Sequence, residues 1–167
     1  MKYTSAEANK LLKKLRTEEM FLRNHEEDAS FFSAALGEDV ESVRPNYDFR
    51  KTVEALEEVQ GRIRAVKHAI NVFNTTAMVG DMTIDEVLIR LPQLKIRQEK
   101  LGSMAMAQPK VRAHAYGSGT STVIDYRYAN YDIPEAKAEY ERVTEEIASL
   151  QLELDRVNTT KLMEISL

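Results

Sequence analysis

The sequence contains no cysteine, and this absence excludes several kinds of site at once. Disulfide bonds, thiolate nucleophiles and zinc sites with cysteine ligands are all ruled out. Histidine is also scarce, with 3 residues among 167. None of the three has a glutamate three positions earlier, as the Glu-x-x-His pairs of a ferritin-like di-metal bundle would require. We therefore expect no metal site and no cofactor.

Glycine and proline are rare as well, at 6 and 4 residues, and no long hydrophobic run occurs. The longest uncharged, mostly apolar stretch near the N-terminus runs from Ala29 to Leu36, far short of the ~20 residues that a membrane-spanning helix needs. The first 20 residues have no apolar core and no cleavage site, so we expect no secretory signal peptide. Hydrophobic residues make up 43% of the chain and charged residues 30%, a balance typical of long amphipathic helices. We expect one cytoplasmic helical domain over residues 1–167, and no membrane association.

Motifs of common catalytic chemistry are missing. The Gly117–Thr120 segment lacks the lysine of a phosphate-binding loop, and no G-x-S-x-G nucleophile motif occurs. His25 belongs to an acidic run that we interpret as a solvated helix face. Glu18 falls on the apolar seam of the first helix, so we expect a basic partner for it from the third helix. These observations favour a protein that is not an enzyme.

Charge is distributed unevenly along the chain, whose net charge is −4. Residues 17–41 hold eight acids and one base, residues 90–112 hold six bases and one acid, and residues 132–155 hold eight acids and two bases. A basic middle between acidic flanks can be neutralised within the fold or across a dimer. Nucleic-acid-binding domains are usually net basic, so we expect no nucleic-acid partner.

Apolar spacing predicts four long helices. The first begins after Thr4, in a capping box with Glu7, and is expected to continue to about Leu36, before Gly37. The second follows a cap at Asn46 or Asp48. Its apolar residues recur every three or four positions, which is a heptad-like seam: Leu56, Val59, Ile63, Val66, Ile70 and Phe73.

The third helix follows a turn at Gly80–Asp81 and a capping box at Thr83–Glu86. It contains Pro92 and ends between Gly102 and Ala107. The fourth helix starts at Asp132 and has the most regular seam: Ala136, Tyr140, Val143, Ile147, Leu150, Leu154 and Val157. We therefore expect a mainly α fold, an up-down four-helix bundle with long coiled-coil-like helices.

A β-hairpin is predicted between the third and fourth helices, as an appendage at about residues 110–128. Side chains alternate on both sides of a Gly-Ser-Gly centre, so Lys110–Tyr116 should pair with Thr122–Tyr128. A lone two-stranded ribbon is marginal in water, so it should pack on the bundle or pair with another copy of the chain. We favour self-association, because tyrosines suit interfaces; the candidate interface residues are Tyr116, Tyr126, Tyr128 and Tyr131.

The same triplet, Asn-Thr-Thr, closes two of the helical patterns, at 74–76 and 158–160. Asparagine tolerates the left-handed conformation of a helix C-terminal cap, so we interpret Asn74 and Asn158 as helix ends that precede extended segments. In an up-down bundle both triplets fall at the same pole. The alternative is a polar small-molecule site at that pole, built from Asn74, Thr75, Thr76, Asn158, Thr159 and Thr160.

Three motifs occur in a fixed order between about Gln60 and Glu164. They are I-N-x-x-N-T-T at 70–76, T-I-x-E-V-L at 83–88 and, after the short β segment, L-D-x-V-N-T-T at 154–160. This order resembles the septicolysin-like family of small bacterial helical proteins. The resemblance implies a helical bundle with a β appendage, and the family name suggests a membrane-active protein as an alternative. The residues themselves favour a non-enzymatic interaction or scaffold protein that forms a homo-oligomer.

Overall fold

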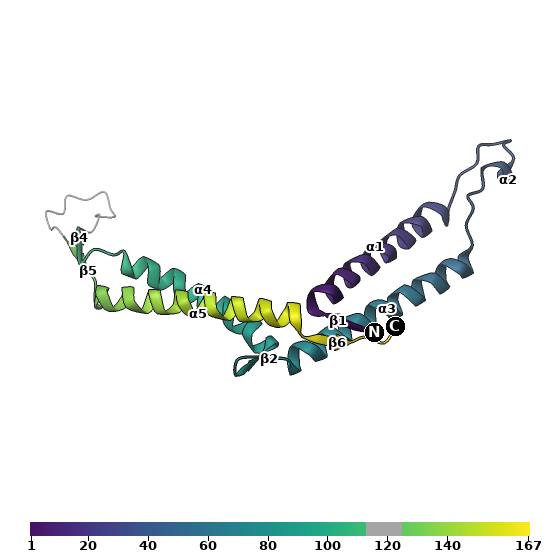
Figure 1. The fold of residues 1–167 in the computed structure, drawn as a ribbon. Coiled ribbons are helices and arrows are strands. Elements are labelled where there is room, and N and C mark those ends of the chain that lie inside the picture. Colours follow the sequence, from purple (N-terminus) through teal and green to yellow (C-terminus); the bar gives the residue numbers. More distant parts are fainter. Residues whose placement is uncertain (113–124) are drawn as a thin grey trace, which may run out of the picture. The chain divides into compact units, whose positions relative to one another are not determined.

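The computed structural model describes residues 1–112 and 125–167, and the chain divides into two compact units. Unit 1 comprises Met1–Ala77 and Arg156–Leu167, and unit 2 comprises Met78–Asp155. Long helices dominate both units, and the strands are short antiparallel pairs (Figure 1). The mainly α prediction is thus confirmed, whereas a four-helix bundle is not. The single-domain prediction stays a prediction, since two compact units can still fold cooperatively.

Unit 1 is built on two helices that lie side by side, α1 (Ser5–Ala29) and α3 (Phe49–Thr76) (Figure 1). Both begin as the sequence predicts. The Thr4 hydroxyl accepts a hydrogen bond from the Glu7 amide at 3.2 Å, and the Glu7 carboxylate accepts one from the Thr4 amide at 2.8 Å. Asp48 caps α3 by accepting from the Lys51 amide at 3.1 Å. These caps satisfy amides that a helix start leaves unpaired.

The predicted continuation of the first helix to Leu36 is wrong, because α1 ends at Ala29. The partner helix α3 begins only at Phe49, so further turns of α1 would have no apolar surface to pack against. Residues 30–48, which we call the connector, instead form a loop that contains one short helix, α2 (Val40–Val43).

The seam of α3 packs as a heptad. Its three buried members, Val59, Val66 and Phe73, are seven residues apart, whereas the intervening seam residues are only partly buried. Ala8 and Leu15 are the most buried apolar residues of α1. When only two helices pack together, one edge of each seam is covered more fully than the other. Buried and partly buried seam residues therefore alternate along α3.

Glu18 is exposed, and its ion-pair partner differs from the one expected. Its carboxylate lies 3.6 Å from the guanidinium of Arg62, on α3 and therefore on the second long helix rather than the third. The adjacent Glu19 accepts a hydrogen bond from the Gln60 side chain at 3.0 Å. These contacts join α1 to α3 beside the apolar seam.

The two ends of the chain pair with each other in unit 1, which the sequence did not indicate. Strand β1 (Lys2–Thr4) runs antiparallel to β6 (Leu162–Glu164), with Tyr3 opposite Met163. The Met1 ammonium donates to the Ile165 carbonyl, and the Ile165 amide donates to the Met1 carbonyl, each at 2.9 Å. Met163 and Ile165 are buried. We call this arrangement the terminal clasp.

Unit 2 opens with a tight turn between β2 (Met78–Val79) and β3 (Met82–Thr83). Gly80 adopts a φ of 62°, a left-handed conformation that favours glycine, as the turn prediction requires. The capping box at Thr83 and Glu86 then starts α4 (Ile84–Ala105). This helix ends within the predicted range, and Pro92 lies on its exposed face.

The second helix of unit 2 is α5 (Ile133–Thr160), of which residues up to Asp155 belong to this unit. It begins as predicted, with the Asp132 carboxylate accepting from the Glu135 amide at 2.9 Å. The apolar seams of α4 and α5 supply the core: Val87, Leu91, Leu94, Ala136, Val143, Ile147 and Leu154. Near one end, the ring of Tyr140 lies so close to Gly102 that a Cβ there would be 3.3 Å from the ring.

The described ends of the predicted hairpin form strands β4 (Lys110–Arg112) and β5 (Tyr126–Tyr128). They are antiparallel, with Lys110 opposite Tyr128 and Arg112 opposite Tyr126, which is the predicted register. The Ala129 amide extends the pairing by donating to the Pro109 carbonyl at 3.0 Å. The centre of the predicted hairpin, Tyr116 included, lies outside the described residues.

The interpretation of Asn74 and Asn158 as helix ends is wrong. Helices α3 and α5 continue through both triplets, to Thr76 and Thr160, and no described residue other than glycine has a positive φ. The threonine hydroxyls bond back to the preceding turn, and the extended segments begin only after the triplets. Each triplet is therefore the last helical turn before a strand, β2 in one case and β6 in the other.

Candidate interaction surfaces

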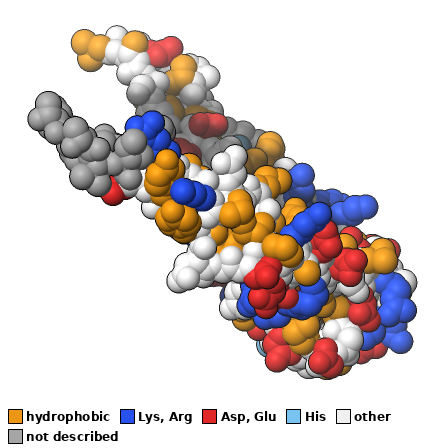
Figure 2. All heavy atoms as spheres, turned by 90° about the vertical axis from the view of Figure 1, so that its left-hand side faces the viewer, with side chains coloured by type: hydrophobic (Ala, Val, Ile, Leu, Met, Phe, Trp, Pro, Cys, Tyr) orange, Lys and Arg blue, Asp and Glu red, His pale blue; other side chains and the backbone are white. Residues whose placement is uncertain are grey.

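The hairpin strands present a basic and aromatic surface. All six residues of β4 and β5 are exposed. The Lys110 ammonium lies 4.0 Å from the ring centroid of Tyr126 and 5.4 Å from that of Tyr128, in cation–π contact. Alternation along a strand places these three side chains and Arg112 on one face of the ribbon. Figure 2 views this end of unit 2, where hydrophobic and basic side chains lie together at the surface.

Tyr131, the fourth candidate interface residue, also makes a contact within unit 2. Its hydroxyl donates to the Met104 carbonyl at 3.1 Å, which ties the segment before α5 to the end of α4. The ring and Leu101 help to line a shallow groove between these helices. Tyr131 thus anchors the base of the hairpin, whereas Tyr126 and Tyr128 remain available for contact.

The connector and the start of α3 expose several large apolar side chains. Phe31 is 88% exposed, Leu36 is fully exposed and Phe49, the first residue of α3, is 67% exposed. In the sequence, the Ala29–Leu36 stretch was interpreted as the end of the first helix and as too short for a membrane span, not as an exposed surface. The signal that could have identified it as a surface is its lack of helical or strand periodicity.

Several polar groups of the connector contact one another. The Arg44 guanidinium makes two hydrogen bonds to the Glu41 carboxylate, at 2.7 and 2.8 Å, and lies 5.1 Å from the ring centroid of Phe32. The Glu38 carboxylate accepts from the Ala35 amide at 2.8 Å. The hydrogen bonds from Arg44 lower the pKa of Glu41, so this carboxylate is ionised at neutral pH. The connector is therefore an acidic surface with apolar projections.

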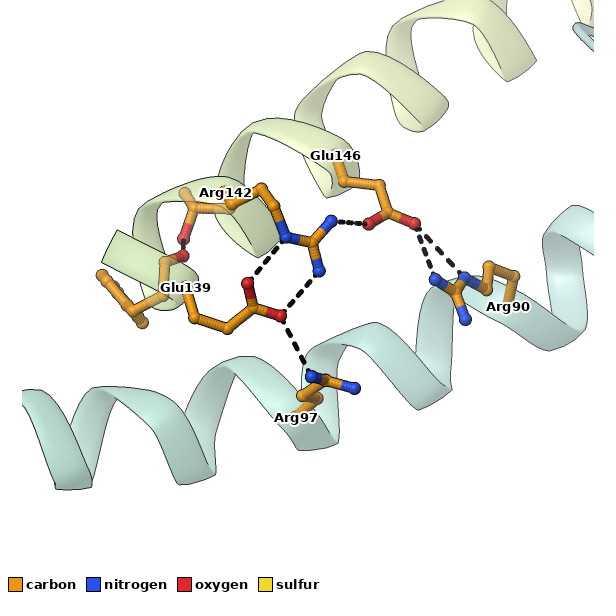
Figure 3. A network of polar contacts seen from close by, with 7 residues as sticks. Arg90, Arg97, Glu139, Arg142 and Glu146 are labelled. Atoms are coloured by element: carbon orange, nitrogen blue, oxygen red, sulfur yellow. Dashed lines mark hydrogen bonds and ion pairs between the residues drawn. The ribbon is translucent and has the colours of Figure 1, made fainter. Parts of the chain in front are cut away.

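A ladder of ion pairs joins α4 to α5 (Figure 3). Arg90 contacts Glu146 at 2.9 Å and Arg97 contacts Glu139 at 3.0 Å, while Arg142 of α5 contacts Glu139 at 2.7 Å and Glu146 at 3.1 Å. Hydrogen bonds from Arg142, reinforced by the charge of Arg97, lower the pKa of Glu139 to about 2. This ladder neutralises two arginines of the basic middle within the unit.

The remaining bases of residues 90–112 are available to contact other molecules. Lys95, Lys100, Lys110 and Arg112 make no ion pair within the described part of the chain. Two of them, Lys110 and Arg112, belong to the hairpin surface. The basic middle is thus neutralised only in part by its own unit.

A mainly apolar groove of about 560 Å³ opens between α3 and β6 within unit 1. Its lining includes Ala69, Val72, Phe73 and Leu162, together with the imidazole-bearing His68 and the hydroxyl-bearing Thr76. Thr76 is the only residue of the Asn/Thr set that lines this groove.

The hydroxyls of the triplets are used within their own helices. Thr76 donates to the Val72 carbonyl at 2.7 Å, and Thr75 reaches the same carbonyl at 3.0 Å. Thr160 and Thr159 both donate to the Arg156 carbonyl, at 2.6 and 3.1 Å. These hydroxyls can still accept hydrogen bonds, so the small-molecule site at the triplets stays a prediction.

The described residues offer neither a metal site nor a membrane-spanning helix. Over residues 1–112 and 125–167, no group of three or more histidine, aspartate or glutamate side chains is arranged to hold a metal ion. No described helix combines the length and the hydrophobicity needed to cross a membrane.

Comparison with known proteins yields a similar fold. No family model matches the chain, and no curated protein does. A solved structure titled as a functionally unknown conserved protein from Corynebacterium diphtheriae is similar to it, with a TM-score of 0.57 and 17% identity. The similarity covers 98% of this chain and 100% of that one. At this identity the likeness concerns the fold alone.

Proposed function

We propose that this chain is a non-enzymatic interaction or scaffold protein of the cytoplasm that associates with itself. The observation that carries the proposal is the hairpin surface, where the exposed rings of Tyr126 and Tyr128 lie beside the Lys110 ammonium. Tyrosine offers apolar area with a polar tip, and aromatic and charged anchors of this kind often dominate interface energies. A ribbon of two strands also gains stability when a partner covers it.

Helix α4 offers a second surface for self-association. Ile89 and Ile96 are 57% and 70% exposed and lie seven residues apart, with the exposed Pro92 between them. At 100° per residue this stripe lies opposite the seam that packs on α5. Burying such side chains contributes about 1.5–3 kcal/mol each. Two α4–α5 pairs that met along these stripes would form a four-helix bundle between copies.

The test is the mass of the protein in solution. Light scattering across a range of protein concentrations should give a mass above 19.1 kDa that falls on dilution. A variant whose residues 110–128 are replaced by a short Gly-Ser linker should have a lower mass at each concentration. Leu152→Ser is the matched control, because it removes an apolar side chain that is 74% exposed on α5 and should leave the mass unchanged. A wild-type mass of 19.1 kDa at every concentration would contradict the proposal.

A membrane-active protein of the septicolysin-like kind is the second candidate. The exposed Phe31 and Leu36 of the connector favour it, because aromatic and aliphatic side chains on a loop can enter the interfacial region of a bilayer. The acidic charge of the connector opposes binding to anionic lipids. Release of a trapped dye from zwitterionic vesicles by the wild-type protein, lost in Phe31→Ser, would support this candidate over self-association.

A further inference from the structure

We propose that the hairpin surface of one copy docks onto the connector of a second copy. This inference rests on the proposed self-association and names the two patches that meet. Both patches expose aromatic or aliphatic side chains: Tyr126 and Tyr128 on the hairpin, Phe31 and Leu36 on the connector. Backbone pairing joins β4 to β5, and within the connector the Glu38 carboxylate accepts from the Ala35 amide.

Charge complementarity selects the connector as the partner of the hairpin. Residues 30–48 carry four acids and one base, of which Glu41 is paired with Arg44 and Asp48 with Lys51. Glu38 and Asp39 make no ion pair among the described residues, so the connector keeps an excess of negative charge. The described hairpin residues, 110–112 and 125–128, carry three bases and one acid. Two hairpins would place like charges together, which opposes direct hairpin–hairpin pairing. A connector facing a hairpin brings opposite charges around an apolar centre.

Docking between two different patches has a consequence for assembly. Each copy carries one hairpin and one connector, so a pair of copies can exchange two equal contacts, and a longer series can form a ring or a chain. A copy with a damaged connector still offers an intact hairpin, and the reverse also holds. Damaged copies of the two kinds should therefore bind each other.

The experiment is a complementation test with two double variants. The first, Phe31→Ser with Leu36→Ser, removes exposed connector side chains, and the second, Tyr126→Ser with Tyr128→Ser, removes exposed hairpin side chains; none of the four is buried, so both variants should fold. Each variant alone should associate with a dissociation constant about tenfold or more above that of the wild type. An equimolar mixture should form a mixed pair, detected by light scattering and by fluorescence transfer between labelled copies.

Four other outcomes would overturn the inference. If the connector variant assembles normally while the hairpin variant does not, the hairpin meets another surface, and the proposed self-association still stands. If both variants lose assembly but the mixture does not restore it, the patches do not meet each other. If the wild type binds vesicles through Phe31 with no change in its own mass, the connector serves a membrane. A monomeric wild type would remove the proposed function together with the inference.

The charges supply an independent readout. Reversing the two bases on the tyrosine face, in Lys110→Glu with Arg112→Glu, should raise the dissociation constant and slow association, most strongly at low salt. The matched control is Lys13→Glu with Lys14→Glu, which changes the net charge by the same amount at exposed sites on α1 outside both patches and should leave the dissociation constant nearer that of the wild type. An unchanged dissociation constant in the hairpin variant would overturn the docking of this surface onto an acidic one.

Discussion

The Arg142 guanidinium forms a two-pronged contact with the Glu139 carboxylate, with both nitrogen–oxygen distances at 2.7 Å. The two residues are three positions apart on α5, and Glu139 also forms an ion pair with Arg97 of α4. The Glu139 carboxylate therefore takes part both in a contact within α5 and in a contact between α4 and α5. Its protonation weakens both contacts at once.

Acid should destabilise unit 2 through this carboxylate. The pKa of Glu139 in the folded protein is about 2, against 4.5 for an unperturbed glutamate. A folded-state pKa below the unfolded one gives stability that is fully present above pH 4.5 and is lost as the pH falls toward 2. We expect the melting temperature to fall over this window, and by less in Glu139→Gln. An equal fall in both proteins would contradict this role of Glu139.

Two helical glycines should respond differently to alanine. Gly61 of α3 has only the Arg64 side chain near its missing Cβ, at 3.8 Å, so Gly61→Ala should stabilise the fold by about 0.5–1 kcal/mol. A Cβ at Gly102 would lie 3.3 Å from the Tyr140 ring, which must shift to make room. Gly102→Ala should therefore stabilise the fold by less than Gly61→Ala does, or destabilise it. Urea denaturation measures both variants, and equal gains would show that the ring moves freely.

The terminal clasp should depend on its buried side chains. Ile165 is 1% exposed, so Ile165→Ala should cost about 2–5 kcal/mol if unit 1 unfolds as a whole. Leu162 lies in the same segment but is 57% exposed, and Leu162→Ala should change stability by at most about 0.5 kcal/mol. Denaturation followed by circular dichroism compares the two. Equal changes in the two variants would mean that the clasp opens without affecting the stability of the core of unit 1.

Substitutions at Asn74 distinguish a helical residue from a left-handed cap. In a helix, alanine is favoured over asparagine by up to about 0.7 kcal/mol, and glycine is the least favourable of the three. The order of stability should therefore be Asn74→Ala, then wild type, then Asn74→Gly. A left-handed cap would place the glycine variant first. Thermal melts of the three proteins decide between the two orders.

Local signals accounted for most of the helical framework. The capping boxes at Thr4 and Thr83 and the cap at Asp132 are side-chain contacts within one helical turn, so sequence spacing was enough to find them. The seams of α3 and α5 repeat over many turns, and their buried faces match the predicted ones. The strand register of the hairpin followed from alternation around its centre.

The remaining features depend on contacts that are distant in sequence. The clasp joins Tyr3 to Met163, and neither strand is long enough to show alternation. The end of α1 at Ala29 is set by the start of α3, which the local pattern cannot report. Helices α3 and α5 run past Asn74 and Asn158 to Thr76 and Thr160, whose hydroxyls donate to carbonyls of the preceding turn. The candidate surfaces were found in part: the hairpin tyrosines were predicted, whereas the Phe31–Leu36 surface was missed.

The clasp also determines how this chain would respond to mechanical force. Met1 and Leu167 extend from the same end of the β1–β6 pair, because Lys2 lies opposite Glu164. Tension applied between the two termini would therefore peel the strands apart one hydrogen bond at a time, rather than shear all of them together. In an optical trap the clasp should open first and at low force, before either helical pair unravels.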